Sequence, residues 1–279
     1  MTSPVATVGV ALKWVPLRVD VDPLTGHVEP DQRSWGMSAA DEAALEWALR
    51  LADRRGAEVL AVSAGDTPAD DAVRAARAVG AHRAVRVTLE PDASSRRVAQ
   101  ALASVLADVP LIVCGDYSKD RGSGSVPSFL AAELGMGQVL GIVAIRDNEE
   151  QCVVDRRLDQ GRRERLALTG PTVLSVEGAT AQLRRAPLPG LLAAGRASVE
   201  VREVAGSTEP DRSPTVAVGP YRPPTRPVTP PDPSNGARGR ILDLTGALTD
   251  RAPAARLDLE PKAAADAIID QLRVWGYLQ

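Results

Sequence analysis

The chain has 279 residues, enough to bury one large core, or one core with a smaller appendage. Its 33 Lys and Arg residues nearly balance its 36 Asp and Glu residues, so a net charge of -3 disfavours a nucleic-acid partner, which usually requires a basic surface. Aromatic residues make up only 3% of the chain, which predicts an aliphatic core of the kind that surrounds buried parallel strands.

The two cysteines, Cys114 and Cys152, lie far apart in the sequence and form no CxxC motif. They predict neither a disulfide framework nor a zinc site, and we interpret them as buried thiols in a reducing cytoplasm. The N-terminal residues show no basic stretch followed by an apolar run, and no apolar segment approaches the ~18 residues of a membrane-spanning helix. We therefore expect a cytoplasmic protein without a membrane span.

The first predicted elements are a buried strand, a long loop or short hairpin, and a helix. ATVGVAL, residues 6–12, has the composition of the strand, and AADEAALEWALRLADRRG, residues 39–56, that of the helix. Ser38 is expected to cap the start of the helix and Gly56 to end it. One apolar stripe predicts which helix face is buried. It consists of Leu45, Ala48, Leu49 and Ala52.

The same alternation continues through three further strand and helix pairs. The expected strands are EVLAVSAG, RAVRVTL and PLIVCG, and the expected helices are DTPADDAVRAARAVG, SSRRVAQALASVLADV and SVPSFLAAELG. Elements of these lengths in alternation predict βαβ units around a parallel sheet. The expected fold class is α/β, with a mostly parallel sheet and helices on both faces, similar to Rossmann-like and adenine-nucleotide alpha hydrolase-like folds.

The pattern changes from residue 137 onward. Three or four strand-like runs with polar turns predict an antiparallel hairpin or meander, after which PTVLSVE returns to the main sheet. Beyond residue 178 the chain is expected to be extended, and residues 205–239 hold nine of the 22 prolines. The last stretch, LEPKAAADAIIDQLRVWGYLQ, predicts an amphipathic helix. We therefore predict an α/β domain at residues 1–204 and a partner-wrapping arm at residues 205–279.

The stretch CGDYSKDRGSGSVP, residues 114–127, lies between a predicted strand and a predicted helix. In open parallel sheets, ligands bind outside the C-terminal ends of the strands. Gly122 and Gly124 allow close approach of the backbone, and Arg121 adds a cation in front of a helix N-terminus that suits phosphate. By composition alone, an ordinary loop before a capped helix is an equal alternative, because the stretch matches neither a Walker motif nor GxGxxG.

Other polar clusters give no catalytic or metal-binding pattern. His27 and His82 have no nucleophile or acid at a recognisable spacing, and the acids of DTPADD are better placed to complement a helix dipole. The basic run RRLDQGRRERL predicts a solvated hairpin face, with contact to a partner subunit as the alternative. The sequence therefore predicts a binding protein rather than a self-sufficient enzyme.

Several segments, in order and at matching spacing, resemble the β subunit of electron transfer flavoprotein. VGVALKWV resembles the opening strand of that family, MSAADEAALEWALRL its long helix, and LRRAPLPGLLAAGRA its partner-recognition loop. The resemblance covers residues 5 to about 200. It implies a heterodimer with an α subunit that holds most of a redox FAD site. The pair would carry electrons from a donor dehydrogenase toward a membrane quinone reductase.

The resemblance also implies ligand and docking residues. β subunits of this family bury an AMP, or a second FAD in electron-bifurcating members. By position, Leu188 and Pro189 would dock the donor dehydrogenase. The nucleotide would contact Ala11, Ser38, Ala64, Asp120, Arg121, Gly122, Ser123, Gly124, Ser125 and Val126.

The loop departs from the pattern of AMP-binding members. DRGSGSVP stands where they carry D-D-D-x-N-Q-T-G, and Ser38 and Ala64 replace a usual Asn and Cys. AMP, a second FAD and no nucleotide all stay open, as does a specialised paralogue tied to a peptide-derived redox cofactor such as mycofactocin. The alternative outside the family is a stand-alone adenine-nucleotide sensor of the universal-stress type. Such a sensor has no use for the APLPGL loop or the long arm.

Overall fold

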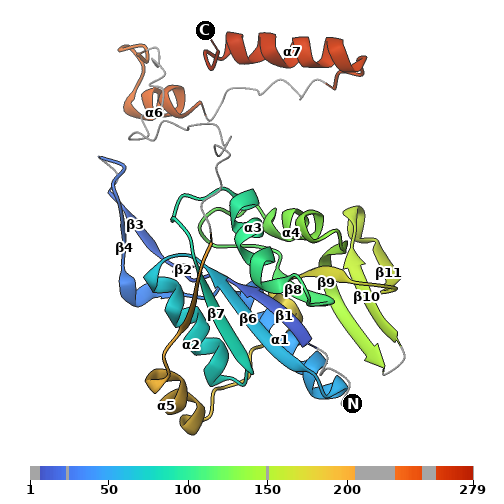
Figure 1. Ribbon diagram of the computed structural model, residues 1–279. Helices are drawn as coiled ribbons and strands as arrows, with labels where there is room; N and C mark the ends of the chain where they lie inside the picture. Colours follow the sequence, from blue (N-terminus) through green and yellow to red (C-terminus); the bar gives the residue numbers. More distant parts are fainter. Residues whose placement is uncertain (1–6, 23–24, 149–150, 205–229, 247–255, 279) are drawn as a thin grey trace, which may run out of the picture. The chain divides into compact units, whose positions relative to one another are not determined.

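The computed structural model describes residues 7–22, 25–148, 151–204, 230–246 and 256–278 (Figure 1). The chain divides into two compact units, Met1–Tyr221 and Arg222–Gln279, which are described separately below. The boundary expected after residue 204 adjoins residues 205–229, which lie outside the described part of the chain. That boundary stays a prediction.

One large sheet forms the centre of the first unit. In the described residues it has nine strands, in the order β11-β10-β9-β12-β8-β1-β6-β7-β13. The neighbours from β12 to β7 all pair in parallel, which confirms the predicted α/β fold class. These central strands are β12 (Thr172–Val176), β8 (Leu111–Gly115), β1 (Thr7–Leu12), β6 (Glu58–Ala64) and β7 (Arg83–Thr88).

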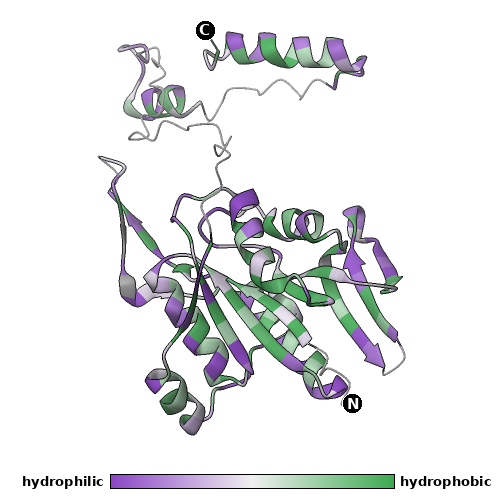
Figure 2. Ribbon diagram, viewed as in Figure 1, coloured by the Kyte–Doolittle hydropathy of each residue, from purple (hydrophilic) through white to green (hydrophobic). Residues whose placement is uncertain are grey.

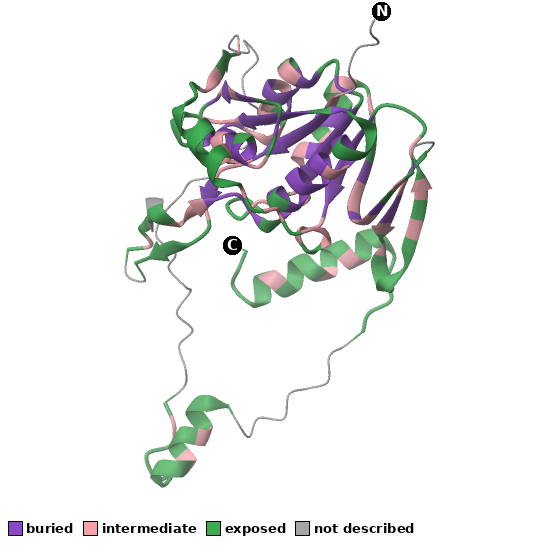
Figure 3. Cartoon of the chain, turned by 90° about the horizontal axis from the view of Figure 1, so that it is seen from below, coloured by how far each residue is buried: buried purple, intermediate pink, exposed green. Residues whose placement is uncertain are grey.

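Helices cover both faces of this sheet. α1 (Ala39–Arg55) and α2 (Asp70–Ala78) pack on one face, and α3 (Ser95–Leu106) and α4 (Val126–Leu134) on the other. Along β6, Val59 belongs to the first core cluster and Leu60 to the second, because successive side chains of a strand point to opposite faces. Both faces are largely buried, and most residues of the central strands are accordingly apolar (Figures 2 and 3).

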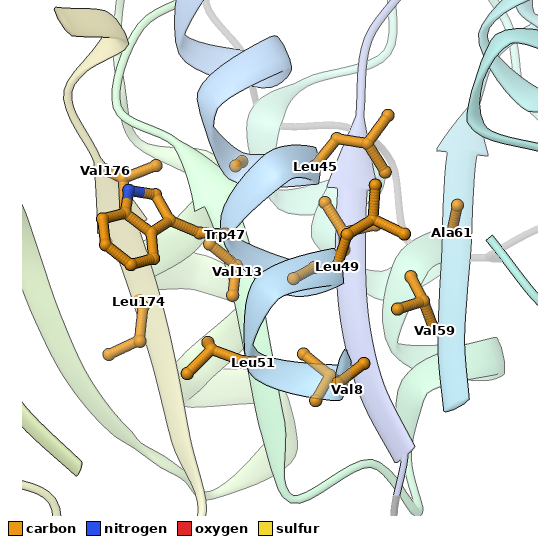
Figure 4. Packing of buried hydrophobic residues seen from close by; sticks show 14 of the residues in the cluster. Val8, Leu45, Trp47, Leu49, Leu51, Val59, Ala61, Val113, Leu174 and Val176 are labelled. Atoms are coloured by element: carbon orange, nitrogen blue, oxygen red, sulfur yellow. The ribbon is translucent and has the colours of Figure 1, made fainter. Parts of the chain in front are cut away.

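α1 carries the largest share of the first core and has the predicted ends. Figure 4 shows Leu45, Leu49 and Leu51 of this helix beside apolar side chains of the strands. Each fully buried leucine contributes about 1.5–3 kcal/mol relative to an exposed one. Ser38 caps the helix by accepting the N–H of Asp41 at 3.2 Å, and Gly56 ends it with φ 60°. Both end signals predicted from the sequence are confirmed.

Two segments that lie between the central elements in the sequence form antiparallel pairs. Residues 13–38 contain two short ribbons, as expected for a hairpin region. They are β2 (Val15–Pro16) with β5 (Trp35–Gly36), and β3 (Val19–Val21) with β4 (Val28–Pro30). The predicted meander is also present, and β12 returns beside β8 as expected. Its strands are β9 (Gly137–Asn148), β10 (Gln151–Arg157) and β11 (Arg163–Ala167).

The chain beyond residue 178 differs from the extended segment expected there. It forms α5 (Leu188–Arg196), which packs on α2, and β13 (Glu200–Glu203), which pairs in parallel with β7. The prolines of RRAPLPGLL suggested a loop. However, Pro189 lies in the first turn of α5, where the fixed φ of proline suits a helix and its missing N–H is not needed.

The second unit contains two helices in its described residues, α6 (Ala237–Thr245) and α7 (Pro261–Val274). α7 confirms the C-terminal helix predicted from the sequence, whereas α6 was not predicted. Neither helix has a buried residue (Figure 3). Both carry exposed large apolar side chains, among them Ile241, Leu244 and Ile268. Within the described ranges, no helix has both the length and the apolar character needed to cross a bilayer.

Candidate functional site

A cleft opens at the C-terminal edge of the parallel sheet, where β1, β6 and β8 end. Its walls also come from α1, α3 and the loop of residues 116–125, which joins β8 to α4. The cleft measures about 730 Å³, a figure that includes the open solvent at its mouth. Its lining consists of Ala11, Leu12, Lys13, Asp41, Ala64, Ser95, Val98, Leu102, Cys114, Gly115, Tyr117, Ser118, Arg121, Ser123, Gly124, Ser125, Val126 and Pro127.

Two glycines give the loop its shape. Gly124 has φ 58°, and a Cβ added there would lie 2.6 Å from the main-chain oxygen of Asp116. Gly122 has φ 63°, and its added Cβ would lie 3.0 Å from the ring of Tyr117. Any larger residue would strain the backbone and collide, so these glycines let the loop fold back on its own start.

The loop leads directly into the N-terminus of α4. Ser125 is the N-cap residue but makes no capping bond with its side chain, and Pro127 occupies the first turn. First-turn N–H groups have no partner within a helix and carry a partial positive charge. Because Ser125, Val126 and Pro127 line the cleft, this end of the site is suited to an anionic group.

An ion pair joins the end of β1 to the loop. Lys13 Nζ lies 2.5 Å from Asp120 Oδ2, although the two residues are 107 positions apart. Burial alone would raise the pKa of Asp120, but the hydrogen bond and the charge of Lys13 hold that pKa below its ordinary value. Asp120 is therefore ionised at neutral pH and compensates much of the charge of Lys13.

Arg121 is held by main-chain oxygens of the segment that precedes α3. Its Nη1 donates to the Ala93 oxygen at 2.5 Å, and its Nη2 donates to the Pro91 oxygen at 2.9 Å. These bonds brace the loop against the segment that leads into α3. The guanidinium lines the cleft, but part of its hydrogen-bonding capacity is already used.

Asp41 places a buried carboxyl group in the cleft wall. It lies in the first turn of α1 and is only 6% exposed. Burial raises its pKa from 3.8 to about 7, although the hydrogen bonds from Ser38 oppose this shift. Ser38 Oγ lies 2.8 Å from Asp41 Oδ2 and 3.1 Å from the main-chain oxygen of Tyr117.

Cys114 lines the cleft from the end of β8. Burial raises the pKa of its thiol to about 12, so the group is neutral at physiological pH. Cys152 lies in β10, and its pKa is raised to about 11, again mainly by burial. Both are free thiols, and neither has the depressed pKa of a reactive cysteine.

The structure brings the predicted nucleotide residues together at this cleft. Ser38 and Asp120 do not line it but hydrogen-bond to residues that do, and Gly122 lies against Tyr117. The other seven line it directly: Ala11, Ala64, Arg121, Ser123, Gly124, Ser125 and Val126. Sequence reasoning missed Lys13 and Asp41 as site residues. The only signal was that each stands at an element end on the edge where ligands bind in such sheets.

Leu188 and Pro189 lie outside the lining of this cleft, at the start of α5. Leu188 is 67% exposed, and Leu191 and Leu192 are also exposed. A Cβ added at Gly190 would lie 2.5 Å from the main-chain oxygen of Ala78, so this glycine allows α5 to lie close against α2. α5 thus presents leucines to solvent on a helix that is held tightly from behind.

An ion-pair network holds the segment that leads into α5. The carboxylate of Glu46, on α1, is buried and accepts hydrogen bonds from the N–H and the Nε of Arg184, both at 3.0 Å. Arg50 Nε donates to the same carboxylate at 2.7 Å. These bonds fix residue 184 on the body of the domain, four positions before Leu188.

Comparisons with known proteins point to one family. The family profile described as "Electron transfer flavoprotein domain" matches residues 25–207. Electron transfer flavoprotein subunit beta of Bacillus subtilis is 28% identical over 185 residues, covering 64% of this chain and 72% of that protein. Protein FixA of Rhizobium meliloti is 30% identical over 239 residues, covering 78% and 81%. The human electron transfer flavoprotein subunit beta is 28% identical over 192 residues, covering 66% and 75%.

Proposed function

The chain belongs to the electron transfer flavoprotein family as a divergent member of β-subunit type, and from this membership we propose how it works. It pairs with an α subunit, and the heterodimer carries electrons from a donor dehydrogenase toward a quinone reductase. The names of the relatives support the pairing, since the Bacillus subtilis and human proteins are each called subunit beta. The same membership favours an electron carrier over the stand-alone nucleotide sensor.

We propose that the cleft holds an adenine nucleotide, either AMP or the adenine end of a second FAD. The observation that carries this proposal is the joining of a helix N-terminus to a cleft with small and apolar walls. Ser123 and Ser125 would hold the phosphate together with the first turn of α4. Val98 and Leu102 of α3 offer apolar surface to the base.

The redox chemistry belongs to the FAD that we propose is shared with the α subunit. FAD supplies one- and two-electron transfer when it is bound. The residues of this chain would bind and orient the flavin and shield it from solvent. We propose no catalytic step for them, and two free, buried thiols support a reducing, cytoplasmic location.

Two surfaces support the proposed partners. The described helices of the second unit have no buried residue, so their apolar faces lack a core of their own, and we propose that the α subunit covers them. Leu188, exposed at the start of the firmly held α5, is the proposed anchor for the donor dehydrogenase, with Pro189 beside it.

Mass spectrometry of the small molecule released from the purified, denatured protein tests the nucleotide proposal. We expect AMP or FAD in a near-stoichiometric amount. Ser125→Glu places a carboxylate at the helix N-terminus that would face phosphate, so this variant should purify with at least about tenfold less nucleotide. Ser128→Glu makes the same change in α4, outside the cleft lining, and should retain it.

The two variants also define the contrary result. If Ser125→Glu and the parent release equal amounts of nucleotide, the ligand lies elsewhere. If the parent releases no nucleotide at all, the cleft has another use.

A further inference from the structure

The hydroxyl of Ser38 has one proton and two acceptors within reach. Its Oγ lies 2.8 Å from Asp41 Oδ2 and 3.1 Å from the main-chain oxygen of Tyr117. The same Oγ accepts the N–H of Asp41 at 3.2 Å. Ser38 and Asp41 are both buried, so a contact that lacks a proton has a real energetic cost.

Protonation of Asp41 resolves this shortage. An ionised Asp41 has no proton to give, so Ser38 can donate either to the carboxylate or to the Tyr117 oxygen, but not to both. A protonated Asp41 donates to Ser38 Oγ, and Ser38 then donates to Tyr117. A hydroxyl oxygen has two acceptor positions, which suffice for the Asp41 N–H and the Asp41 carboxyl proton. The proton thereby links the start of α1 to the loop of residues 116–125.

The surroundings of Asp41 also favour its protonated form. Lys13, the residue that follows β1, favours the ionised form, but it is paired with Asp120 of the loop, which disfavours that form. Cys114 from β8 is a neutral thiol, and Glu42 on the same helix is exposed. Burial is the largest influence and raises the pKa of Asp41 to about 7, so this proton is exchanged in the physiological range.

The protonation state of Asp41 also determines the net charge of the cleft lining. Among the described residues that line the cleft, three have side chains that can be charged: Lys13, Asp41 and Arg121. With Asp120 compensating Lys13, a protonated Asp41 leaves the net positive charge of Arg121. An ionised Asp41 cancels that charge and disfavours an anion in a site of low dielectric constant.

We propose that Asp41 is a specificity-determining residue of this cleft, which takes a phosphate-bearing nucleotide together with one proton from solvent. The proton is held between Asp41 Oδ2 and Ser38 Oγ. This inference rests on the proposed nucleotide site. It adds that anion affinity falls as Asp41 ionises, whereas a permanently ionised carboxylate would select a cationic or hydrogen-donating ligand.

The test measures binding of AMP to the full chain, stripped of nucleotide, from about pH 7 to about pH 9. This range lies above the second phosphate pKa of about 6, so the charge of the probe is constant. For the parent we expect the Kd to rise by nearly tenfold per pH unit at the upper end of the range, the slope of one linked proton. Asp41→Asn keeps the shape and the hydrogen-bond donor but cannot ionise. Its Kd should change by less than about threefold.

Two further measurements keep the test decisive. Glu42→Gln removes an exposed carboxylate from the same helix turn and should follow the parent. Titration calorimetry of the parent near pH 8, in two buffers with different ionisation enthalpies, should show uptake of close to one proton per AMP. This second readout needs no variant, so a poorly folded Asp41→Asn would not block the test.

The opposing results separate this inference from the proposed function. Binding of AMP that is independent of pH, or that strengthens with pH, overturns the role of Asp41 and leaves the nucleotide site standing. A steep slope retained by Asp41→Asn does the same. Absence of binding by AMP and by FAD at every pH overturns both.

Discussion

Three titratable side chains at the cleft differ in what sets their pKa. Burial raises the pKa of Cys114 to about 12 and that of Asp41 to about 7. The pKa of Asp120 is also pushed upward by burial, but its bond to Lys13 prevails and holds the value below the ordinary one. At neutral pH the cleft therefore has a neutral thiol, an ionised carboxylate paired with Lys13, and an Asp41 that exchanges its proton.

The raised pKa of Asp41 predicts a pH-dependent stability. The folded state holds this proton more tightly than the unfolded state. The parent should therefore lose stability as the pH rises from about 4 to about 7, and the loss should stay in full above that range. Asp41→Asn cannot ionise and escapes the loss. Without ligand, the free energy of unfolding of Asp41→Asn should exceed that of the parent by up to roughly 4 kcal/mol near pH 8. Near pH 4 the two proteins should differ little.

Urea unfolding of both proteins across this pH range provides the measurement. Glu42→Gln is the control: partial burial also raises the pKa of Glu42, but this side chain is largely exposed, so the variant should depart from the parent far less than Asp41→Asn does. Superimposable pH profiles for the parent and Asp41→Asn would show that Asp41 is readily solvated in the folded protein.

At the scale of single elements, α5 provides a docking prediction. Leu188 is 67% exposed, so its removal leaves the core intact, and an interior role for this leucine is not supported. Burial of a leucine in the pocket of a partner contributes about 1.5–3 kcal/mol. Leu188→Ala should therefore weaken binding of the donor dehydrogenase by about one to two orders of magnitude, with unchanged flavin content and an unchanged melting temperature.

The measurement is the rate of flavin reduction as a function of donor dehydrogenase concentration. Val201→Ala, which trims an exposed aliphatic side chain on the neighbouring β13, is the matched control and should behave as the parent. A Leu188→Ala protein that is reduced at the parent rate but melts several degrees lower would contradict the docking role.

Local signals made most elements predictable. The helix at residues 39–55 has a serine before its first turn, an apolar stripe and a glycine after its last turn. The start signal, the periodicity and the stop signal therefore all predict the same helix. The central strands are largely buried on both faces and stand out as mostly apolar runs. α5 was missed because Pro-Leu-Pro-Gly carries the residues of a turn, and only packing on α2 makes a helix of it.

The position of the site was predictable from the sequence, but the pairing of Lys13 with Asp120 and the burial of Asp41 were not. The glycines of the loop and the strand-end position of residues 114–127 pointed to the cleft. The ion pair of Lys13 with Asp120 spans 107 positions, and nothing in the local sequence indicates it. Asp41 lies in the first turn of α1 next to Glu42, and only its burial in the cleft wall distinguishes it from this exposed neighbour.

At the scale of the whole molecule, the two units differ in what holds them together. The first unit has apolar cores on both faces of its sheet, whereas the described helices of the second unit bury no residue. Helices with exposed apolar faces and no buried residue are marginal in water. We propose that contacts with a partner subunit stabilise α6 and α7.

The central claim is that this chain is the β half of an electron-carrying heterodimer. Its most direct test is co-expression of the full chain with an α subunit of the same family, followed by size-exclusion chromatography with detection of flavin absorbance. We predict a 1:1 complex that carries flavin, and a strong loss of that complex when the chain ends at residue 221, before the second unit. Elution of a flavin-loaded α subunit without the full chain would contradict the claim.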